Sequence, residues 1–383
     1  MPELPEVETI RRGLARLGWP RRVRSVTVLD PRSLRRHPGG PEDFAQTLTG
    51  TLLHTPRRRG KFLWLPADTV PADAGTPRPG TPTGRQPSVG APRADAAPAP
   101  GGSTACLLAH LGMSGQLLSD APPHRHDRIR ITLGPVEGAS EPTVDETGDD
   151  LPSSPAVGPA ESSPGTTRVV ATGASVVQTV TLVFRDQRLF GSLAIDTLQA
   201  DAFRLRTGPH TIPAQVAHIA PDPLEPGADP RAQAARLRRH RSAIKRVLLD
   251  QTVVSGIGNI YADESLWAAR VHPEQQAGTL GPRVAVRLMR AVAEVMRRAI
   301  TAGGTSIDEQ YRHVNGASGW FDVELAAYGR TGRPCPRCGT PIRRGAFLNR
   351  SSHWCPRCQR LRRPAREQAG RHRTSRTREE TTA

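Results

Sequence analysis

The sequence is almost free of lysine. Only two of its 53 basic residues are lysines, Lys61 and Lys245, and the rest are arginines. A GC-rich coding bias favours arginine in general, so the two lysines could mark sites that arginine cannot serve. Lysine is a compact point charge that can lose its proton, whereas arginine stays charged. Chance is the alternative explanation, and the surroundings of each lysine decide between the two.

Long apolar stretches and disulfide-forming cysteines are also scarce. The chain has no run of about 18 apolar residues, and its N-terminus lacks the apolar core of a signal peptide. These absences argue against a membrane-spanning helix and predict a soluble cytoplasmic protein, although so basic a chain could also touch anionic lipid. Four of the five cysteines lie close together near the C-terminus, and the fifth, Cys106, is interpreted as a buried strand residue.

What the chain has in excess is positive charge. Its formal net charge is +17, and 37 prolines accompany 36 glycines in 383 residues. A polyanion is the natural partner for such a charge. The length allows two or three domains, and the low apolar content of 36% indicates that much of the chain is not packed into a core.

The first half of the chain has the pattern of many short strands. Behind Pro5 an amphipathic helix is predicted, and a basic turn at 57–61 enters an apolar strand. Further strands are predicted at 23–29, 105–111, 116–118, 128–133, 176–184 and 192–195. Short strands between turn signals are typical of a β-sandwich or barrel. Two segments, 67–104 and 136–175, have no hydrophobic periodicity, so we expect disordered insertions there.

The second half has the pattern of helices followed by a cysteine module. Leu237, Ile244 and Leu248 suit one helix, a glycine-rich turn at 253–264 opens another, and 280–300 forms a longer one. The predicted fold class is therefore multidomain α+β. It comprises an N-terminal β-sandwich domain with flanking helices (1–196), a helical domain (211–330), a cysteine module (331–361) and a basic disordered tail (362–383).

The first nine residues carry a chemical signal. Removal of Met1 would leave Pro2 with a free secondary amine, which can attack an electrophilic carbon and form a Schiff base, as activated lysines do. The α-amino pKa, about 7.7–8.0, needs only a modest downward shift, and the dipole of the following helix favours that shift. Glu3 could act as the general acid and base. An ordinary capped surface helix is the alternative interpretation.

Four cysteines have the spacing of a metal site. Cys-Pro-Arg-Cys occurs twice, separated by sixteen residues, and supplies Cys335, Cys338, Cys355 and Cys358. Four thiolates close a tetrahedron around zinc and leave no position for water, so such a zinc would be structural. A pair of disulfides is the alternative, which a reducing cytosol disfavours.

The start of the chain resembles formamidopyrimidine-DNA glycosylase, a bacterial repair enzyme for oxidised purines, and the resemblance extends with two interruptions to about Gln359. It implies that Pro2 is the nucleophile and that Glu3 transfers protons. It further implies that Lys61 contacts the damaged nucleotide and that Arg350, on a zinc-stapled hairpin, reaches the DNA backbone at the lesion. The turn at 255–261 is similar to the helix–two-turn–helix element of this family, whose glycines and helix-start amides would face a phosphate.

The resemblance assigns DNA contacts to seven further side chains. They would bind the backbone, fill the space left by an extruded nucleotide or face the orphaned base: Met113, His126, Arg188, Phe190, His240, Lys245 and Asn259. Without the resemblance, periodicity alone would make Met113 and Phe190 core residues and His126 a surface residue. Both lysines thus fall at expected functional positions, which weakens the explanation by chance.

Three places depart from the family pattern. His240 stands where the family commonly has a DNA-contacting lysine, and Leu189 stands where many relatives have a second basic residue. Residues 305–320 align with the loop that closes over the flipped purine, but they differ from several relatives, so individual contacts cannot be assigned. Gly316 and Gly319 would allow this loop to move.

The expected function is that of a bifunctional DNA glycosylase and abasic-site lyase. It would act as a monomer on duplex DNA that contains oxidised purines or abasic sites, with one structural Zn²⁺ and no membrane partner. One alternative is the sister endonuclease VIII-type glycosylase for oxidised pyrimidines, which typically has glycine where this chain has Leu4. The others are a non-catalytic protein that binds damaged DNA and an RNA-binding zinc-ribbon protein.

Overall fold

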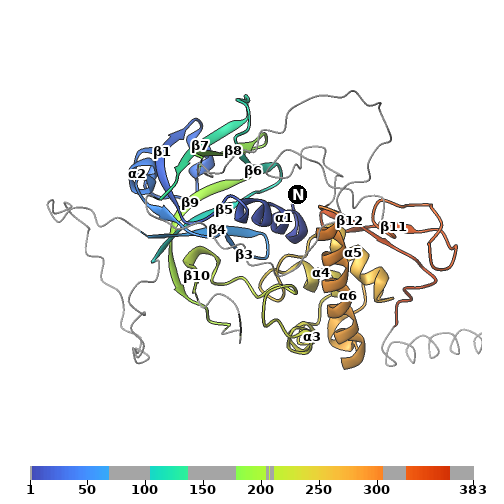
Figure 1. Cartoon of the computed structure of the whole chain (residues 1–383). Helices are drawn as coiled ribbons and strands as arrows, with labels where there is room; N and C mark the ends of the chain where they lie inside the picture. The colour runs from blue at the N-terminus through green and yellow to red at the C-terminus, as the bar shows by residue number, and fades with distance from the viewer. Residues whose placement is uncertain are drawn as a thin grey trace, which may run out of the picture.

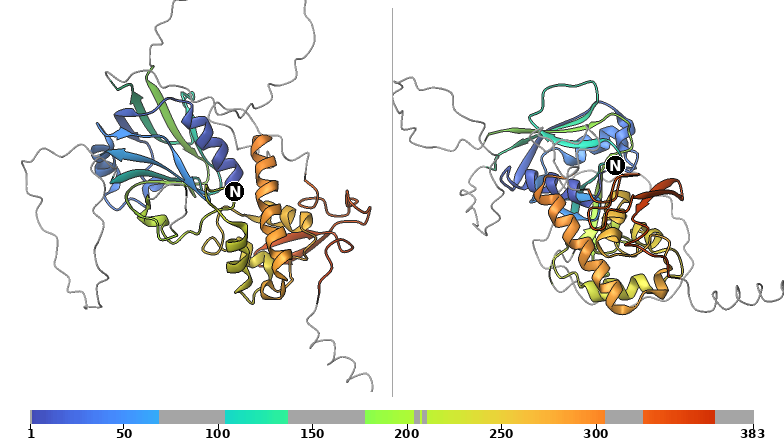
Figure 2. Two further views of the ribbon diagram at one scale, coloured as in Figure 1. Left: turned by 60° about the horizontal axis from the view of Figure 1, so that its bottom comes forward. Right: turned by 90° about the vertical axis from the view of Figure 1, so that its right-hand side faces the viewer.

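The computed structural model describes residues 2–68, 104–136, 178–203, 207, 211–304 and 325–362. Nearly all of the two predicted insertions, the whole of the 305–320 loop and the basic tail after residue 362 lie outside these residues. Within them, two bodies meet beside the start of the chain, with the β-strands on one side and the helices and the cysteine hairpin on the other (Figures 1 and 2).

The first helix, α1 (Leu4–Ala15), joins the two bodies. Glu3 is its N-cap residue and forms a capping box with Glu6, so the helix begins at a fixed point. Val7, Ile10 and Leu14 are buried in the core of the β-rich body, as their helical spacing predicts. Leu4 is buried in the other core, among the side chains of the helical body. The start of α1 therefore belongs to both cores.

In the described residues ten strands form one antiparallel sheet, nine of them along a continuous path. In spatial order they are β10 (Thr211–Pro213), β9 (Ser192–Ala200), β5 (Ala105–His110), β4 (Phe62–Asp68), β2 (Leu52–Leu53), β1 (Arg21–Val28), β7 (Asp127–Gly134), β8 (Val180–Asp186) and β6 (Gly115–Ser119), with β3 (Arg57–Arg59) beside β4. Side chains from β4 and β5 share one buried cluster with those from β7 and β8, and α1 and α2 (Gly40–Leu48) contribute to it. The predicted β-sandwich with flanking helices is confirmed.

The sheet extends beyond the predicted strands. The apolar pattern predicts a strand at 192–195, but β9 continues to Ala200 and pairs with β10 through Ala200 and Thr211. The second half of β9 is largely exposed, so its outward side chains are polar and carry no hydrophobic signal. Periodicity therefore detects only the buried half of this strand.

The helical body contains α3 (Pro230–Arg238), α4 (Ile244–Leu249), α5 (Asn259–Ala268) and α6 (Pro282–Thr301). The expected helix at 280–300 agrees closely with α6. The single helix expected through Leu237 and Leu248 is wrong, because α3 ends at Arg238 and α4 begins at Ile244. Ala243 between them has an extended backbone and bridges to Gln276. The seven-residue spacing from Leu237 to Ile244 mimics a continuous helix.

Two arginines of the basic turn at 57–61 form ion pairs inside the protein. Arg58 is buried and forms ion pairs with Glu8 (2.9 Å) and Asp222 (2.7 Å). Arg59 is buried and pairs with Asp201 and Glu225, each at 2.5 Å. Asp201, Asp222 and Glu225 lie in or beside the segment that leads from the sandwich to the helices. These two arginines therefore tie the bodies together, which their place in a basic run did not indicate.

The last two strands that the structure describes form a hairpin. The strands β11 (Arg343–Phe347) and β12 (Arg350–Trp354) pair in register from Arg343 and Trp354 to Phe347 and Arg350. Ser352 and His353 of β12 bond to the Asp263 carboxylate of α5, so the hairpin is fixed to the helical body. Among the helices described, none is long and apolar enough to cross a membrane.

The Arg59 cluster should contribute strongly to stability. Arg59→Met leaves two buried carboxylates without their cation, and breaking a buried ion pair in this way costs about 3–5 kcal/mol. The free energy of unfolding, measured by urea denaturation, should fall by that amount. Arg57→Met is the matched control, because Arg57 is exposed on the same short strand. Equal losses in the two variants would show that the buried cluster contributes nothing particular.

Candidate active site

The carboxylate of Glu3 is held inside the protein at the start of α5. It accepts hydrogen bonds from the backbone amides of Gly258 (2.7 Å), Ile260 (3.0 Å) and Tyr261 (3.3 Å). Glu3 as a whole is only 3% exposed to solvent. These amides are the unpaired donors of a helix N-terminus, which suit an anion. Glu3 therefore fills an anion site that belongs to the opposite body.

Burial changes the acidity of Glu3. The loss of water raises its pKa above the ordinary value, Lys61 opposes this rise, and Glu6 adds to it. A carboxyl with a raised pKa keeps its proton at a higher pH than an exposed glutamate and can donate it to a reacting group. The adjacent Pro2 is also buried, so the first two functional candidates share one enclosed place.

Glu6 fixes the backbone that leads into this place. One of its carboxylate oxygens accepts the backbone amide of Glu3 at 2.8 Å, and the other accepts the hydroxyl of Tyr261 at 2.7 Å. The hydroxyl of Tyr261 is thus bound to α1 while its backbone amide is bound to Glu3. Glu6 and Tyr261 were not among the site residues predicted from the sequence, although Glu3 and Glu6 have the spacing of a capping box.

Two glycines make room for the start of the chain. A Cβ atom on Gly258 would lie 2.2 Å from Cδ of Glu3, and one on Gly256 would lie 2.5 Å from Cδ1 of Leu4. Gly256 also has a φ of +86°, which favours glycine. The turn at 255–261 was expected to turn its glycines and amides toward a phosphate. Instead, Gly256 and Gly258 accommodate Leu4 and Glu3, and three of the amides are occupied by the Glu3 carboxylate.

Lys61 enters the same region from the β3–β4 turn. The preceding Gly60 has a φ of +54° and packs so closely on Ser255 that an added Cβ would lie 2.7 Å from its hydroxyl. Lys61 is buried, which lowers its pKa, while Glu3 raises that pKa and Arg350 lowers it further. Its charge is thus felt by both other catalytic candidates. A lysine whose pKa is lowered can exchange a proton closer to neutral pH than an exposed one.

A cavity of about 540 Å³ opens beside Glu3. Its lining comes from the residue before α1, the start of α5, the segment after residue 325 and the hairpin: Glu3, Asn259, Ile260, Tyr328, Gly329, Thr331, Arg344, Arg350, Ser351 and His353. Arg350 is exposed at the start of β12 and faces this space. The structure therefore brings together Glu3, Asn259 and Arg350, which are far apart in sequence.

Asn259 and Lys245 connect the helical body to the hairpin by hydrogen bonds. The amide of Asn259 donates to the carbonyl oxygen of Ser351 at 3.1 Å, and Nζ of Lys245 donates to the same oxygen at 2.9 Å. Lys245 also pairs with Asp263 at 2.6 Å, and its side chain has no exposed surface. Burial lowers the pKa of Lys245, and Asp263 raises it. A direct phosphate contact by Lys245, as the resemblance implies, would require this pair to open.

Glu264 holds the segment that carries Tyr328. Its buried carboxylate accepts the backbone amides of Ala326 (2.9 Å), Ala327 (2.8 Å) and Tyr328 (2.7 Å). Burial raises the pKa of Glu264, and these three amides oppose the rise. A glutamate in the middle of a helix gives no sequence signal for such a role, so it was missed.

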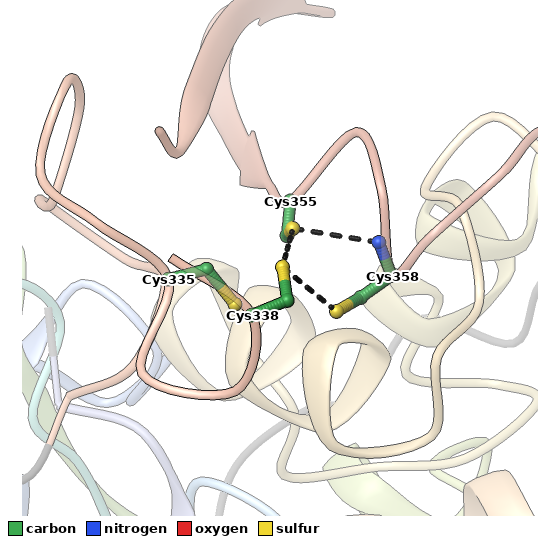
Figure 3. Close-up of side chains that lie close together, drawn as sticks. All are labelled: Cys335, Cys338, Cys355 and Cys358. Atoms are coloured by element: carbon green, nitrogen blue, oxygen red, sulfur yellow. Dashed lines mark hydrogen bonds between the residues drawn. The ribbon is translucent and has the colours of Figure 1, made fainter. Parts of the chain in front are cut away.

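The four cysteines converge as their spacing predicts. Their sulfur atoms all lie within 4.8 Å of one another, between the turn at 335–338 and the end of β12 (Figure 3). Zinc bound to four thiolates at 2.3 Å requires sulfur atoms separated by about 3.8 Å, so the donor set and its arrangement fit this ion. The indole of Trp267 donates to Sγ of Cys335 at 3.3 Å and links the site to α5. Such a site fixes the hairpin that presents Arg350.

Comparisons with known proteins agree with this arrangement. Three family models match: the formamidopyrimidine-DNA glycosylase N-terminal domain over residues 1–145, the formamidopyrimidine-DNA glycosylase H2TH domain over 219–311 and the zinc finger found in FPG and IleRS over 332–361. The formamidopyrimidine-DNA glycosylase of Salinispora arenicola is 41% identical over 94% of this chain and 96% of its own length. That of Leifsonia xyli is 43% identical over 94% and 100%.

The chain belongs to the formamidopyrimidine-DNA glycosylase family.

Solved structures of this family have the same fold. The complex of the Lactococcus lactis enzyme with abasic-site DNA aligns with a TM-score of 0.61 and 26% identity, over 94% of this chain and 99% of that one. A complex of MutM with DNA that contains carbocyclic 8-oxo-G aligns with a TM-score of 0.62 and 26% identity, over 94% and 100%. The resemblance and the fold class expected from the sequence are confirmed, and the matching zinc-finger model supports one structural Zn²⁺.

The three residues assigned to the extruded-nucleotide space come together on two loops. Met113 lies between β5 and β6, and Arg188 and Phe190 lie between β8 and β9. A Cβ on Gly112 would lie 2.2 Å from the backbone carbon of Phe190, so the loops touch. The guanidinium of Arg188 stacks 5.3 Å from the ring centre of Phe190, which is 47% exposed. An exposed aromatic ring beside an arginine fits the predicted role of these residues, which remains a prediction.

A hydrogen-bond network supports the loop of Arg188 and Phe190. The buried carboxylate of Asp186 accepts hydrogen bonds from the hydroxyl of Ser114 at 2.5 Å and from the backbone amide of Gly191 at 2.7 Å. Arg35 donates to the carbonyl oxygens of Leu189 and Gly191 at 2.8 and 2.7 Å, and also to that of Phe190. Leu189 has a φ of +57°, and this support holds its unfavourable backbone. Arg35 was not identified from the sequence.

The two histidines lie away from the cavity. His126 precedes β7 among basic neighbours, and desolvation together with Arg125 lowers its pKa. It therefore stays neutral to a lower pH than an ordinary histidine. His240 lies in the connection between α3 and α4, where its backbone amide bonds to Leu237. Their predicted DNA contacts stay predictions.

The close approach of Gly258 to Glu3 can be tested by adding one methyl group. Gly258→Ala should lower the free energy of unfolding by about 1–3 kcal/mol, as overpacking does, because the new Cβ overlaps the Glu3 carboxyl. The backbone of Gly258 is extended and accepts alanine, so the cost comes from the contact alone. Gly281→Ala is the control, since nothing lies within 4 Å of its Cβ. An unchanged thermal midpoint for Gly258→Ala would contradict the packing.

The zinc site predicts a selective effect of cysteine replacement. Cys355→Ala should reduce the zinc content, measured by plasma mass spectrometry, from one ion per chain to none. Trypsin should then cut the hairpin faster at Arg343, Arg344 and Arg350, because the hairpin loses its staple. Cys106→Ala should keep the zinc, because Cys106 is buried in β5 and is not part of the cluster. Retention of zinc by Cys355→Ala would exclude this cysteine as a ligand.

Proposed function

We propose that the chain removes oxidised purines from duplex DNA and then cleaves the strand at the resulting abasic site, with the amine of Pro2 as the nucleophile. The observation that carries this proposal is the enclosed position of Pro2 and Glu3, against the amides of α5 and beside Lys61. Relatives in complex with abasic-site, Fapy-dG and 8-oxo-G DNA support this substrate class.

The first step makes one bond and breaks another. The Pro2 nitrogen bonds to C1′ of the deoxyribose as the bond from C1′ to the base breaks, and a proton must reach the departing base or the sugar oxygen. Glu3 is suited to supply it, because burial keeps its carboxyl protonated to a higher pH than usual. Opening of the sugar ring then leaves an iminium between Pro2 and C1′. Met1 must be removed beforehand, since an amide nitrogen cannot do this.

The second step uses the acidity that the iminium creates. The C2′ proton becomes removable, its loss expels the 3′ phosphate, and a second elimination expels the 5′ phosphate, which leaves a one-nucleotide gap. Lys61 is placed to move protons, because burial lowers its pKa and Glu3 lies within its field. Arg350 faces the cavity with an exposed guanidinium, which suits a phosphate at the lesion. A Zn²⁺ held by Cys335, Cys338, Cys355 and Cys358 would leave no position open for water, so it would supply no catalytic chemistry and would fix the hairpin.

DNA binding follows from the same arrangement. We propose that the duplex lies between the sandwich and the helical body, with Met113, Arg188 and Phe190 replacing the extruded nucleotide. Asn259, His126 and His240 would contact the DNA backbone. Lys245 would hold the hairpin in place through its hydrogen bond to the carbonyl oxygen of Ser351. We further propose that the protein acts as a monomer in the cytoplasm, where bacterial DNA lies.

The nucleophile is tested by trapping. Borohydride reduces an iminium to a stable amine, so incubation with an 8-oxoguanine:cytosine duplex should give a covalent protein–DNA adduct. Pro2→Leu should keep Met1 and lower the trapping rate by about 10³-fold or more, as loss of a nucleophile does. Pro5→Ala, three residues further along, keeps the amine and should trap at a near-normal rate.

Two outcomes would overturn the proposal. Undiminished trapping by Pro2→Leu would place the nucleophile elsewhere. Tight binding of the duplex by the unaltered protein, with no release of base and no adduct, would make it a binding protein. A duplex with thymine glycol belongs in the same assay, because one related structure is a Lactococcus lactis complex with an oxidised pyrimidine. Faster excision of thymine glycol than of 8-oxoguanine would reverse the substrate assignment.

A further inference from the structure

A second cavity, of about 620 Å³, lies between α3 and the first half of α6. We call it the α3–α6 groove. Its lining consists of Arg231, Ala234, Ala235, Arg238, Pro282, Arg283, Val286, Arg287 and Arg290. The volume falls within the range of about 300–1,000 Å³ that is typical of ligand pockets. The catalytic proposal makes no use of it.

The floor of the α3–α6 groove is apolar. Ala234 and Val286 belong to or pack against the core of the helical body, and Ala235 and Pro282 are exposed beside them. Aliphatic surface that a monomer leaves open inside a groove is typical of a binding site for another molecule. The floor therefore favours an occupant with apolar side chains.

The walls of the groove are positively charged. They consist of five arginines, and the lining contains no acidic residue. Arg238 donates to the carbonyl of Leu280 at 2.7 Å, and Arg287 donates to that of Ala269 at 3.2 Å. These acceptors are neutral, and within the described part of the chain none of the five arginines forms an ion pair. Their charge thus remains available to an acidic occupant.

The α3–α6 groove is remote from the active site. Gly304, just beyond the C-terminal end of α6, lies against Glu6, whereas the groove residues occupy the opposite half of this helix. At 1.5 Å per residue, Arg290 and Pro282 lie roughly 15 and 30 Å along the axis from the C-terminal end of α6. Figure 1 shows α3 and the end of α6 that lies beside it at the edge of the helical body, away from the N-terminus of the chain.

We propose that the α3–α6 groove binds an acidic, amphipathic segment of a partner protein, whose carboxylates pair with the arginines while its apolar side chains cover the floor. Duplex DNA would satisfy the arginines but leave the apolar floor uncovered. A second copy of this chain is disfavoured because each copy carries a net charge of +17. An acidic segment with apolar residues matches both properties of the groove.

The test uses the full-length, zinc-loaded protein and a fluorescent twelve-residue peptide with glutamates on one helical face and leucines on the other. Its anisotropy should show saturable binding. The double variant Arg283→Glu/Arg290→Glu should weaken binding about tenfold or more, as loss of charged partners at an interface does. Arg16→Glu/Arg24→Glu changes the net charge equally on the sandwich and should keep the affinity within about twofold, because it leaves the interface intact.

A third variant separates the floor from the walls. Ala235→Arg fills the floor of the groove while it adds a positive charge. It should therefore lower the affinity for the peptide about tenfold, whereas attraction by charge alone would raise that affinity. An oligoglutamate of the same length should bind more weakly than the amphipathic peptide to the unaltered protein. Equal binding of both peptides, or tighter binding by Ala235→Arg, would overturn the proposal.

Two further measurements distinguish other occupants. If Arg283→Glu/Arg290→Glu loses more affinity for an undamaged duplex than the sandwich double variant does, the groove binds DNA instead. If sedimentation shows a dimer that Ala235→Arg dissociates, the occupant is a second copy. Either result would overturn the proposal. Unchanged duplex affinity and an unchanged sedimentation coefficient, together with weakened peptide binding, would support it.

Discussion

The structure depends on one set of hydrogen bonds, from the backbone amides at the start of α5 to the carboxyl group of Glu3. A buried carboxylate needs donors, and a helix N-terminus buried at a domain junction needs an acceptor. Each body of the protein supplies what the other lacks. The same contact places Pro2 beside the region where Glu3, the start of α5 and the hairpin approach one another, so the requirements of folding and those of the proposed chemistry fall on the same atoms.

The surrounding contacts restrict this junction to one arrangement. Leu4 packs into the helical core, and Arg58 and Arg59 bind acids on the connecting segment. Beyond α5, the Asp263 carboxylate accepts hydrogen bonds from β12 and pairs with Lys245. A continuous chain of polar contacts thus runs from the first helix to the hairpin that carries Arg350. The charged groups in it are buried, so each must keep its partner.

Much of the fold could be read from the sequence, because buried strands, the α6 stripe and the cysteine spacing have strong periodic or chemical signals. The rest could not, for identifiable reasons. Half-exposed strands such as the end of β9 carry polar side chains, and a seven-residue spacing hid the break before α4. In the site, Glu3 and Lys61 were predicted from their residue types and positions, and the structure brings them close enough to influence each other's pKa, while their roles stay predictions. Arg35 and Glu264 were missed because they bond to backbone groups of segments that only the fold brings near them.

The separation of Glu3 from Gly258 by 255 residues has a consequence during protein synthesis. The N-terminal residues leave the ribosome first, yet the amides that receive the Glu3 carboxylate are translated only after two thirds of the chain. A nascent or prematurely terminated fragment that stops before α5 carries the amine but has no pocket around it. The enclosed site on which the proposed chemistry depends therefore forms only once α5 has been made and has folded.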